Sequence, residues 1–104
     1  MVSQTMLDDI HQRLAAVFGE RLKGVVLYGS EARGEAEPDS DIDLLVLLEG
    51  PVELGKDLDT VIRAIYPVQL ETDRLIDACP VDVEAYEAGD YAFYRRARRE
   101  GVRV

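Results

Sequence analysis

Hydrophobic residues recur at helical spacing in two parts of the chain. The first pattern predicts an amphipathic helix over residues 5–22, with Ser3 or Thr5 as its N-cap. Its apolar positions are Leu7, Ile10, Leu14, Val17, Phe18 and Leu22. The second pattern predicts a helix that ends before Pro67, because the residue preceding a proline avoids the helical conformation. The apolar positions of that helix are Leu54, Leu58, Val61, Ile62 and Ile65.

Continuous aliphatic runs predict two strands between these helices, joined by a helical turn at 30–33. Residues 25–28 are expected to form a short buried strand. Residues 41–48 are expected to form a central strand, and their apolar second half predicts burial on both faces. A third strand is predicted over residues 68–79. In that register Glu71, Asp73 and Asp77 share one face, because successive strand residues point to opposite sides.

The remainder of the chain predicts two further helices. Asp82 is expected to cap a short helix that reaches Tyr86. A last helix runs from about residue 91 to residue 100, with Gly101 as its C-cap and an extended end. Together these elements predict an α+β fold, a small mixed β-sheet with helices mainly on one face and carboxylates on the other, open face. The length of 104 residues is that of a single domain, 1–104.

The distribution of charge excludes several functions. Residues 1–90 contain 7 Lys and Arg against 20 Asp and Glu, whereas residues 91–104 contain five arginines and one glutamate, for a net charge of −9. Such an acidic body disfavours broad nucleic-acid binding.

No apolar run approaches the roughly 20 residues of a membrane span. A single cysteine, Cys79, fits a reducing compartment, so we expect a cytoplasmic protein, and leave open whether it forms an oligomer.

The strongest chemical signal lies between residues 28 and 48. Gly29-Ser30 is followed, after ten residues, by Asp41-Ile42-Asp43. Residues i and i+2 of a strand point the same way, so the two aspartates can lean together around divalent cations. Carboxylate oxygens are ligands that Mg²⁺ prefers. The glycine removes side-chain bulk, and the serine offers a hydroxyl and an N–H group to phosphate oxygens. The stretch therefore predicts a site for metal and nucleotide.

This stretch resembles the signature of the nucleotidyltransferase superfamily typified by DNA polymerase beta. Within it, the chain is most similar to the minimal nucleotidyltransferases, which are often antitoxin partners of HEPN-domain toxins. The matching residues are Gly29-Ser30, the ten-residue spacer, Asp41 and Asp43, and residues 32–34. The resemblance implies magnesium-dependent transfer of a nucleoside monophosphate, AMP from ATP, to a hydroxyl of a partner protein, a HEPN toxin. Asp41, Asp43 and a third carboxylate would hold two Mg²⁺ ions.

In this superfamily the third carboxylate usually comes from the neighbouring strand. Asp73 is our preferred candidate as catalytic residue and metal ligand, followed by Asp77 and Glu71. Asp82, in the sequence Pro-Val-Asp-Val-Glu, also resembles the family's third site, but a role as helix N-cap is sufficient to explain it.

Several alternatives stay open at this stage. Arg33 either contacts the nucleotide's phosphates or pairs with Glu35 or Glu37. The arginines of residues 95–99 form either a solvated helix face or, with neighbouring aromatic residues, a docking surface. The chain as a whole could instead be a non-catalytic antitoxin that neutralises its partner by occlusion. A third function is transfer to a small molecule such as an aminoglycoside, with a second subunit completing the pocket.

Overall fold

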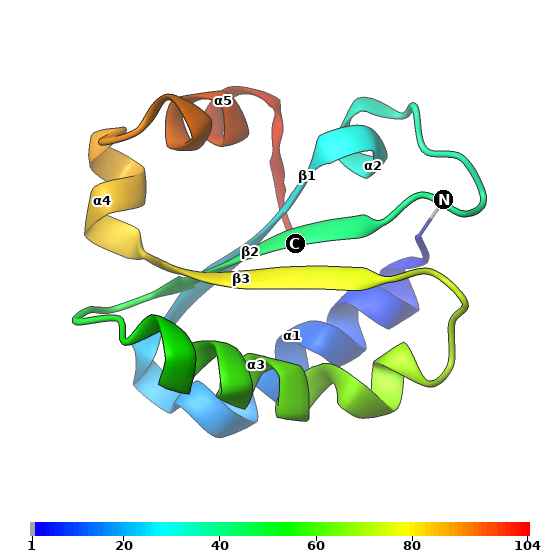
Figure 1. Ribbon diagram of the computed structural model, residues 1–104, viewed down its shortest axis with the longest axis horizontal. Helices are drawn as coiled ribbons and strands as arrows, with labels where there is room; N and C mark the ends of the chain where they lie inside the picture. Colours follow the sequence, from blue (N-terminus) through cyan, green and yellow to red (C-terminus); the bar gives the residue numbers. More distant parts are fainter. Residues whose placement is uncertain (1) are drawn as a thin grey trace.

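The computed structural model describes residues 2–104, in which four strands form one mixed sheet with the order β3-β2-β1-β4 (Figure 1). Strands β2 and β3 are parallel, whereas β1 pairs antiparallel with both β2 and β4. This confirms the predicted α+β class and the mixed sheet. The elements are α1 (Gln4–Phe18), a 3₁₀ turn η1 (Gly19–Arg21), β1 (Leu22–Tyr28), α2 (Gly29–Arg33), β2 (Ile42–Leu48), α3 (Leu54–Gln69), β3 (Ile76–Asp82), α4 (Val83–Ala88), α5 (Ala92–Glu100) and β4 (Val102–Arg103).

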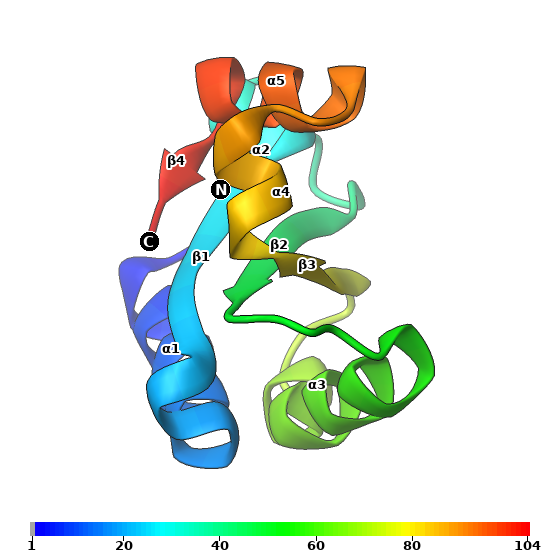
Figure 2. The same ribbon diagram turned by 90° about the vertical axis from the view of Figure 1, so that its left-hand side faces the viewer.

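The two long helices, α1 and α3, cover one face of the sheet, while the short helices α4 and α5 lie across part of the other (Figures 1 and 2). The larger core lies under α1 and α3 and contains residues such as Leu14, Leu44 and Val61. A smaller core lies under α4 and α5, around Leu45, Leu47 and Tyr86. Strand β2 is buried on both faces over residues 44–48, as predicted.

Helix α1 confirms one of the two predicted caps. The Ser3 side chain accepts a hydrogen bond from the Met6 N–H, at 3.1 Å, whereas Thr5 lies inside the helix. The helix ends at Phe18 rather than at residue 22, because Gly19 adopts a φ of +57°, in the left-handed region that favours glycine. Leu22, predicted as the last helical position, is instead the first residue of β1.

The prediction that the second helix stops before Pro67 is wrong, since α3 continues to Gln69 with this proline inside it. Pro67 lies in the last turn, where its missing N–H removes only one helical hydrogen bond, to the carbonyl of the exposed Arg63. Val68 is buried in the core, which holds this turn in helical form. Packing therefore outweighs the local preference of the proline.

The strand predicted over residues 68–79 is consequently wrong over 68–75. The chain turns after α3, and the N–H groups of Glu71 and Thr72 donate to the carbonyls of Val68 and Gln69. Strand β3 begins only at Ile76. At its far end the Asp82 side chain accepts the Glu84 N–H, at 2.8 Å, and caps α4 as predicted. Within residues 2–104, no helix is long and apolar enough to cross a membrane.

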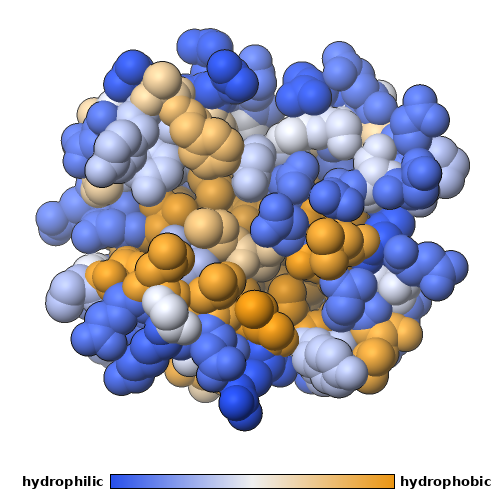
Figure 3. All heavy atoms as spheres, viewed as in Figure 1, coloured by the Kyte–Doolittle hydropathy of each residue, from blue (hydrophilic) through white to orange (hydrophobic). Residues whose placement is uncertain are grey.

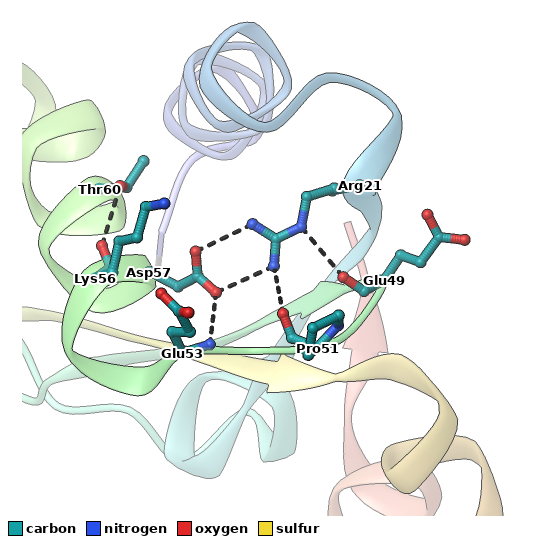
Figure 4. A network of polar contacts seen from close by, with 7 residues as sticks. All are labelled: Arg21, Glu49, Pro51, Glu53, Lys56, Asp57 and Thr60. Carbon is teal, nitrogen blue, oxygen red and sulfur yellow. Dashed lines mark hydrogen bonds and ion pairs between the residues drawn. The ribbon is translucent and has the colours of Figure 1, made fainter.

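An ion pair between the partly exposed Arg21 and the buried Asp57 joins the turn η1 to the start of α3 (Figure 4). The Arg21 guanidinium donates to both carboxylate oxygens of Asp57, each at 3.1 Å, and to the carbonyls of Glu49 and Pro51. The Glu53 N–H also donates to Asp57. The Arg21 hydrogen bonds hold the pKa of Asp57 below its ordinary value despite burial, which acts to raise it.

We expect Asp57→Ala to lower the free energy of unfolding by about 2 kcal/mol, because charge-assisted hydrogen bonds are lost and partners are left unpaired. Since the folded-state pKa is depressed, the stabilisation is full above the unfolded-state pKa of about 4 and disappears as the pH falls through the folded value. Urea unfolding of wild type and variant should therefore differ clearly near neutral pH and converge in acid. Asp59→Ala, which removes an exposed acid from the same helix, serves as the control.

Candidate active site

Three polar side chains form a row across one end of the sheet. Tyr28 at the end of β1 is paired with Asp43 of β2, and Asp43 is paired in register with Asp77 of β3. Neighbours in register on adjacent strands share a face, and their strands lie about 4.8 Å apart. Asp43 and Asp77 are therefore adjacent on the face opposite α1 and α3. This places the carboxylates on the face predicted for them.

Asp43 has a raised pKa. Burial raises the pKa of this group, and Asp77 and Asp41 raise it further, while Arg33 acts in the opposite direction. Asp41 itself is exposed and lies just before β2. An aspartate that carries negative neighbours, in a half-buried position, is stabilised by a bound cation. The donor set, with carboxylate oxygens and no His or Cys ligand from these positions, fits Mg²⁺ or Mn²⁺.

The carboxylates do not form a closed metal cage. Across residues 2–104, no group of three or more His, Cys, Asp or Glu side chains is close enough together to hold a metal ion by itself. Mg²⁺ in phosphoryl-transfer sites is commonly bound by one or two carboxylates together with substrate phosphates. Among the described residues, a metal ion at Asp43 and Asp77 would need further oxygen ligands.

Gly29 lies directly against the carboxylate of Asp43. Its φ is +71°, and a Cβ atom placed on it would lie 2.5 Å from Oδ2 of Asp43. Every other residue type would thus collide with the carboxylate and strain the turn. Ser30 follows at the second position of α2. Gly29 and the second aspartate of the motif, 14 positions later in the sequence, therefore lie side by side.

The structure separates the candidates for the third carboxylate. Asp77 lies beside Asp43, whereas the preferred candidate, Asp73, is exposed in the turn before β3 and does not belong to the strand. The shared face predicted for Glu71, Asp73 and Asp77 is thus a wrong prediction, since it rested on the wrong strand boundary. Glu71 lines a groove with the start of α1. Asp82 lies opposite Leu48, at the other end of the sheet from Asp43.

A buried ion pair that could not be predicted from the sequence holds α2, the helix that begins with Gly29 and Ser30. Glu31, whose side chain is 1% exposed, follows Ser30 in α2, and its carboxylate lies 2.5 Å from Nη1 of Arg74. The Nε–H group of Arg74 donates to the carbonyl of Ser40, at 2.7 Å. Arg74 therefore joins α2, the loop before β2 and the loop before β3. Charge patterning alone could not reveal this pair, because the two residues are 43 positions apart.

A small cavity of about 180 Å³ opens beside Gly29, between α2 and α5. Tyr28 and Phe93 contact each other edge-to-face in its wall, with ring centroids 5.3 Å apart. Arg33 and Arg96 also line it. Arg33 forms the exposed pair with Glu35 that was one of its two expected roles, at 3.2 Å, yet it also faces this cavity. Arg96 comes from the C-terminal arginine run and adds positive charge beside the site.

Removing the charge of Asp43 should stabilise the metal-free protein. A carboxyl whose folded-state pKa is raised gains stability as the pH falls and loses it when ionised, so Asp43 strains the fold at neutral pH. We expect Asp43→Asn to melt several degrees above wild type in chelator, where about 1 kcal/mol corresponds to 4–8 °C. Thermal unfolding by circular dichroism measures this, with Asp39→Asn as control. A lower melting temperature would show that Asp43 is instead a structural hydrogen-bonding residue.

Comparisons with known proteins identify the family of this chain. Residues 8–93 match the family model described as a nucleotidyltransferase domain. Over 60 residues the chain is 38% identical to a protein of Methanocaldococcus jannaschii named "putative protein adenylyltransferase"; this match covers 58% of the chain and 41% of that protein, so the chain spans about two fifths of its relative.

A crystal structure titled "putative nucleotidyltransferase", from Sulfolobus solfataricus, shares the fold with a TM-score of 0.67. The two chains are 22% identical, and the superposition covers 95% of this chain and 76% of that one. The resemblance read from Gly29-Ser30 and Asp41-Ile42-Asp43 is thus confirmed at the level of the superfamily. Since the family model covers well over half of its residues, the chain belongs to the nucleotidyltransferase domain family.

Proposed function

We propose that this nucleotidyltransferase moves AMP from ATP to a hydroxyl group of a partner protein. The observation that carries the proposal is the in-register pairing of Asp43 with Asp77, directly beside the Gly29-Ser30 turn. This arrangement brings cation-binding oxygens next to groups that can bind phosphate. The name of the Methanocaldococcus jannaschii relative supports a protein as acceptor.

In the proposed reaction, the acceptor oxygen forms a bond to the α-phosphorus of ATP. The bond from that phosphorus to the α,β-bridging oxygen breaks, and pyrophosphate leaves with the electron pair. Asp41, Asp43 and Asp77 would hold Mg²⁺, which supplies neutralisation of the charge on the phosphates. We assign the role of the third carboxylate to Asp77 in place of Asp73. The exposed carboxylate of Asp77 can also accept the proton of the acceptor hydroxyl.

The remaining residues of the site would orient the nucleotide. Gly29, which has no side chain, would let the phosphates come close to the backbone. The Ser30 hydroxyl and N–H group can donate to the β- and γ-phosphates. Arg33 and Arg96 flank the adjoining cavity and can add charge-assisted hydrogen bonds. Burial and the nearby Asp43 and Asp77 raise the pKa of Tyr28 to about 12, so its hydroxyl stays protonated well above neutral pH. Positioning and charge neutralisation would supply most of the rate.

We further propose a HEPN-domain toxin as the partner, which would make this protein its antitoxin. The support is the similarity of residues 28–48 to the minimal nucleotidyltransferases. The experiment incubates the protein with Mg²⁺, ATP labelled in the α-phosphate, and the candidate toxin. Wild type should label the toxin, and Asp43→Asn should not.

The labelling experiment also distinguishes the two rival functions. If the toxin is neutralised equally by wild type and Asp43→Asn, and neither labels it, the protein acts by occlusion as a non-catalytic antitoxin. If label passes to an aminoglycoside but to no protein, the acceptor is a small molecule. The pairing of Asp43 with Asp77 favours catalysis, because occlusion alone requires no adjacent carboxylates.

A further inference from the structure

An apolar stripe follows the exposed side of α3. Its members are spaced by four residues, so successive members are neighbours and the row winds slowly around the helix. They are Leu54, Leu58, Ile62, Tyr66 and Leu70, of which all but Leu58 are more than half exposed. Figure 3 shows the apolar side chains gathered on this side of the molecule, over α3 and β3. A contiguous apolar surface of this kind on a soluble protein marks a binding site.

The middle of the stripe, Leu58, Ile62 and Tyr66, forms one wall of a groove of about 380 Å³. Ile62 and Tyr66 line the α3 side, and Leu75, Asp77 and Ala78 line the β3 side. Asp77 thus lies at the edge between the groove on the α3 side of β3 and the row of carboxylates on the other face of the sheet. A partner held in the groove would reach the proposed transfer site with a segment that passes around the edge of β3.

The outer edge of β3 is poorly suited to accept another strand. The Leu75 carbonyl accepts the Ile42 N–H of β2, at 2.8 Å, so alternation directs the even-numbered residues of β3 outward. The outward N–H of Ile76 is already bonded to the Gln69 side chain, at 2.8 Å, and Pro80 has no N–H. Over residues 76–80 this leaves only Ala78 with an N–H free for pairing. The occupant must therefore bind through side chains, as a helix does.

Charge around the groove selects a basic occupant. Over residues 54–78, Asp57 and Asp59 are paired with arginines, and Arg74 is paired with Glu31. In this segment the exposed acids without an ion pair are Glu71, Asp73 and Asp77. The segment has one exposed cation without an ion pair, Lys56. A second copy of this chain would bring the same acids together, and each copy carries a net charge of −9. A partner helix flanked by Lys and Arg would complement them.

We propose that the groove between α3 and β3 docks a basic amphipathic helix of the partner protein. Only the identification of this partner as the acceptor rests on the proposed function. Docking there would hold the partner beside Asp77, so that a hydroxyl on a neighbouring segment reaches the site. Binding itself requires neither nucleotide nor metal.

The test uses a fluorescent helical peptide of roughly 18 residues, or five turns, with Leu along one face and Lys and Arg on the others. Binding is measured by anisotropy with the metal-free protein in chelator at physiological salt. We expect Ile62→Glu to weaken binding at least about tenfold. Val17→Glu, which changes an equally exposed residue on α1 (49% against 52%), should bind like wild type. A peptide of the same composition with its Leu residues scattered should bind wild type as weakly as the amphipathic peptide binds Ile62→Glu.

The remaining outcomes overturn the proposal. Equal binding by Ile62→Glu and Val17→Glu would show that the peptide is held by general charge attraction. Tighter binding by an extended peptide than by the helical one would show that β3 accepts a strand. If sedimentation shows that wild type dimerises and that Ile62→Glu abolishes the dimer, a second copy occupies the groove. Asp43→Asn should bind the peptide like wild type, so loss of transfer and loss of docking are separable.

Discussion

Asp77→Asn should lower nucleotidyl transfer by about 10²-fold or more, the loss typical of removing a positioned acid–base group. Asp73→Asn should leave the rate close to that of wild type. The reason is the register of the sheet, which places Asp77 beside Asp43 and leaves Asp73 in an exposed turn. The measurement is pyrophosphate release from Mg-ATP in the presence of the acceptor.

The two variants are matched, because both neutralise an exposed aspartate and neither residue packs in the core. Circular dichroism at the assay temperature checks that both stay folded. Asp82→Asn is a third member of the set and should also have little effect on transfer, since asparagine caps a helix nearly as well as aspartate. If Asp73→Asn were the severe variant instead, the assignment of the third carboxylate to Asp77 would be wrong.

Arg74→Ala should cost about 3–5 kcal/mol of unfolding free energy, because it leaves the buried Glu31 carboxylate without its partner. This is a large share of the 5–15 kcal/mol that stabilises a typical domain. The matched control is Arg63→Ala, which breaks an ion pair of α3 that is 80% and 61% exposed. Such a surface pair contributes only about 0.3–0.5 kcal/mol. Urea unfolding at neutral pH measures both.

A double-mutant cycle separates this pair from general damage to the loops. Glu31→Gln combined with Arg74→Ala should be less destabilising than the sum of the two single variants, since the second change removes a charge that the first has already left unpaired. Additive losses would show that Glu31 and Arg74 act independently. Because Arg74 also binds the Ser40 carbonyl, the single variant should loosen the loop that leads into Asp41 and Asp43.

The local part of the site could be predicted from sequence, since it depends on neighbours along the chain. The position of Gly29-Ser30 after one strand and of Asp43 at the start of another follows from the aliphatic runs that flank them. The non-local part could not. The choice between Asp73 and Asp77 depends on where α3 ends, and Pro67 gave a misleading local signal that the burial of Val68 overrides.

Other features of the site arise only when distant segments meet. The sequence suggested that Gly29 lets a phosphate come close to the backbone. In the fold, a side chain at this position would also collide with the carboxylate of Asp43. The pairing of Glu31 with Arg74 and the place of Arg96 beside Gly29 depend on tertiary packing. A run of arginines in a sequence does not show which of them faces a cavity.

The most direct measurement is calorimetric titration with Mg²⁺ and an ATP analogue whose α,β-bridge cannot be cleaved. We predict that wild type binds the analogue in a Mg²⁺-dependent manner and that Asp43→Asn loses at least about tenfold in affinity. Asp39→Asn, which neutralises an exposed acid outside the site, should bind like wild type. Equal, metal-independent binding by all three proteins would contradict a metal–nucleotide site at Asp41, Asp43 and Asp77.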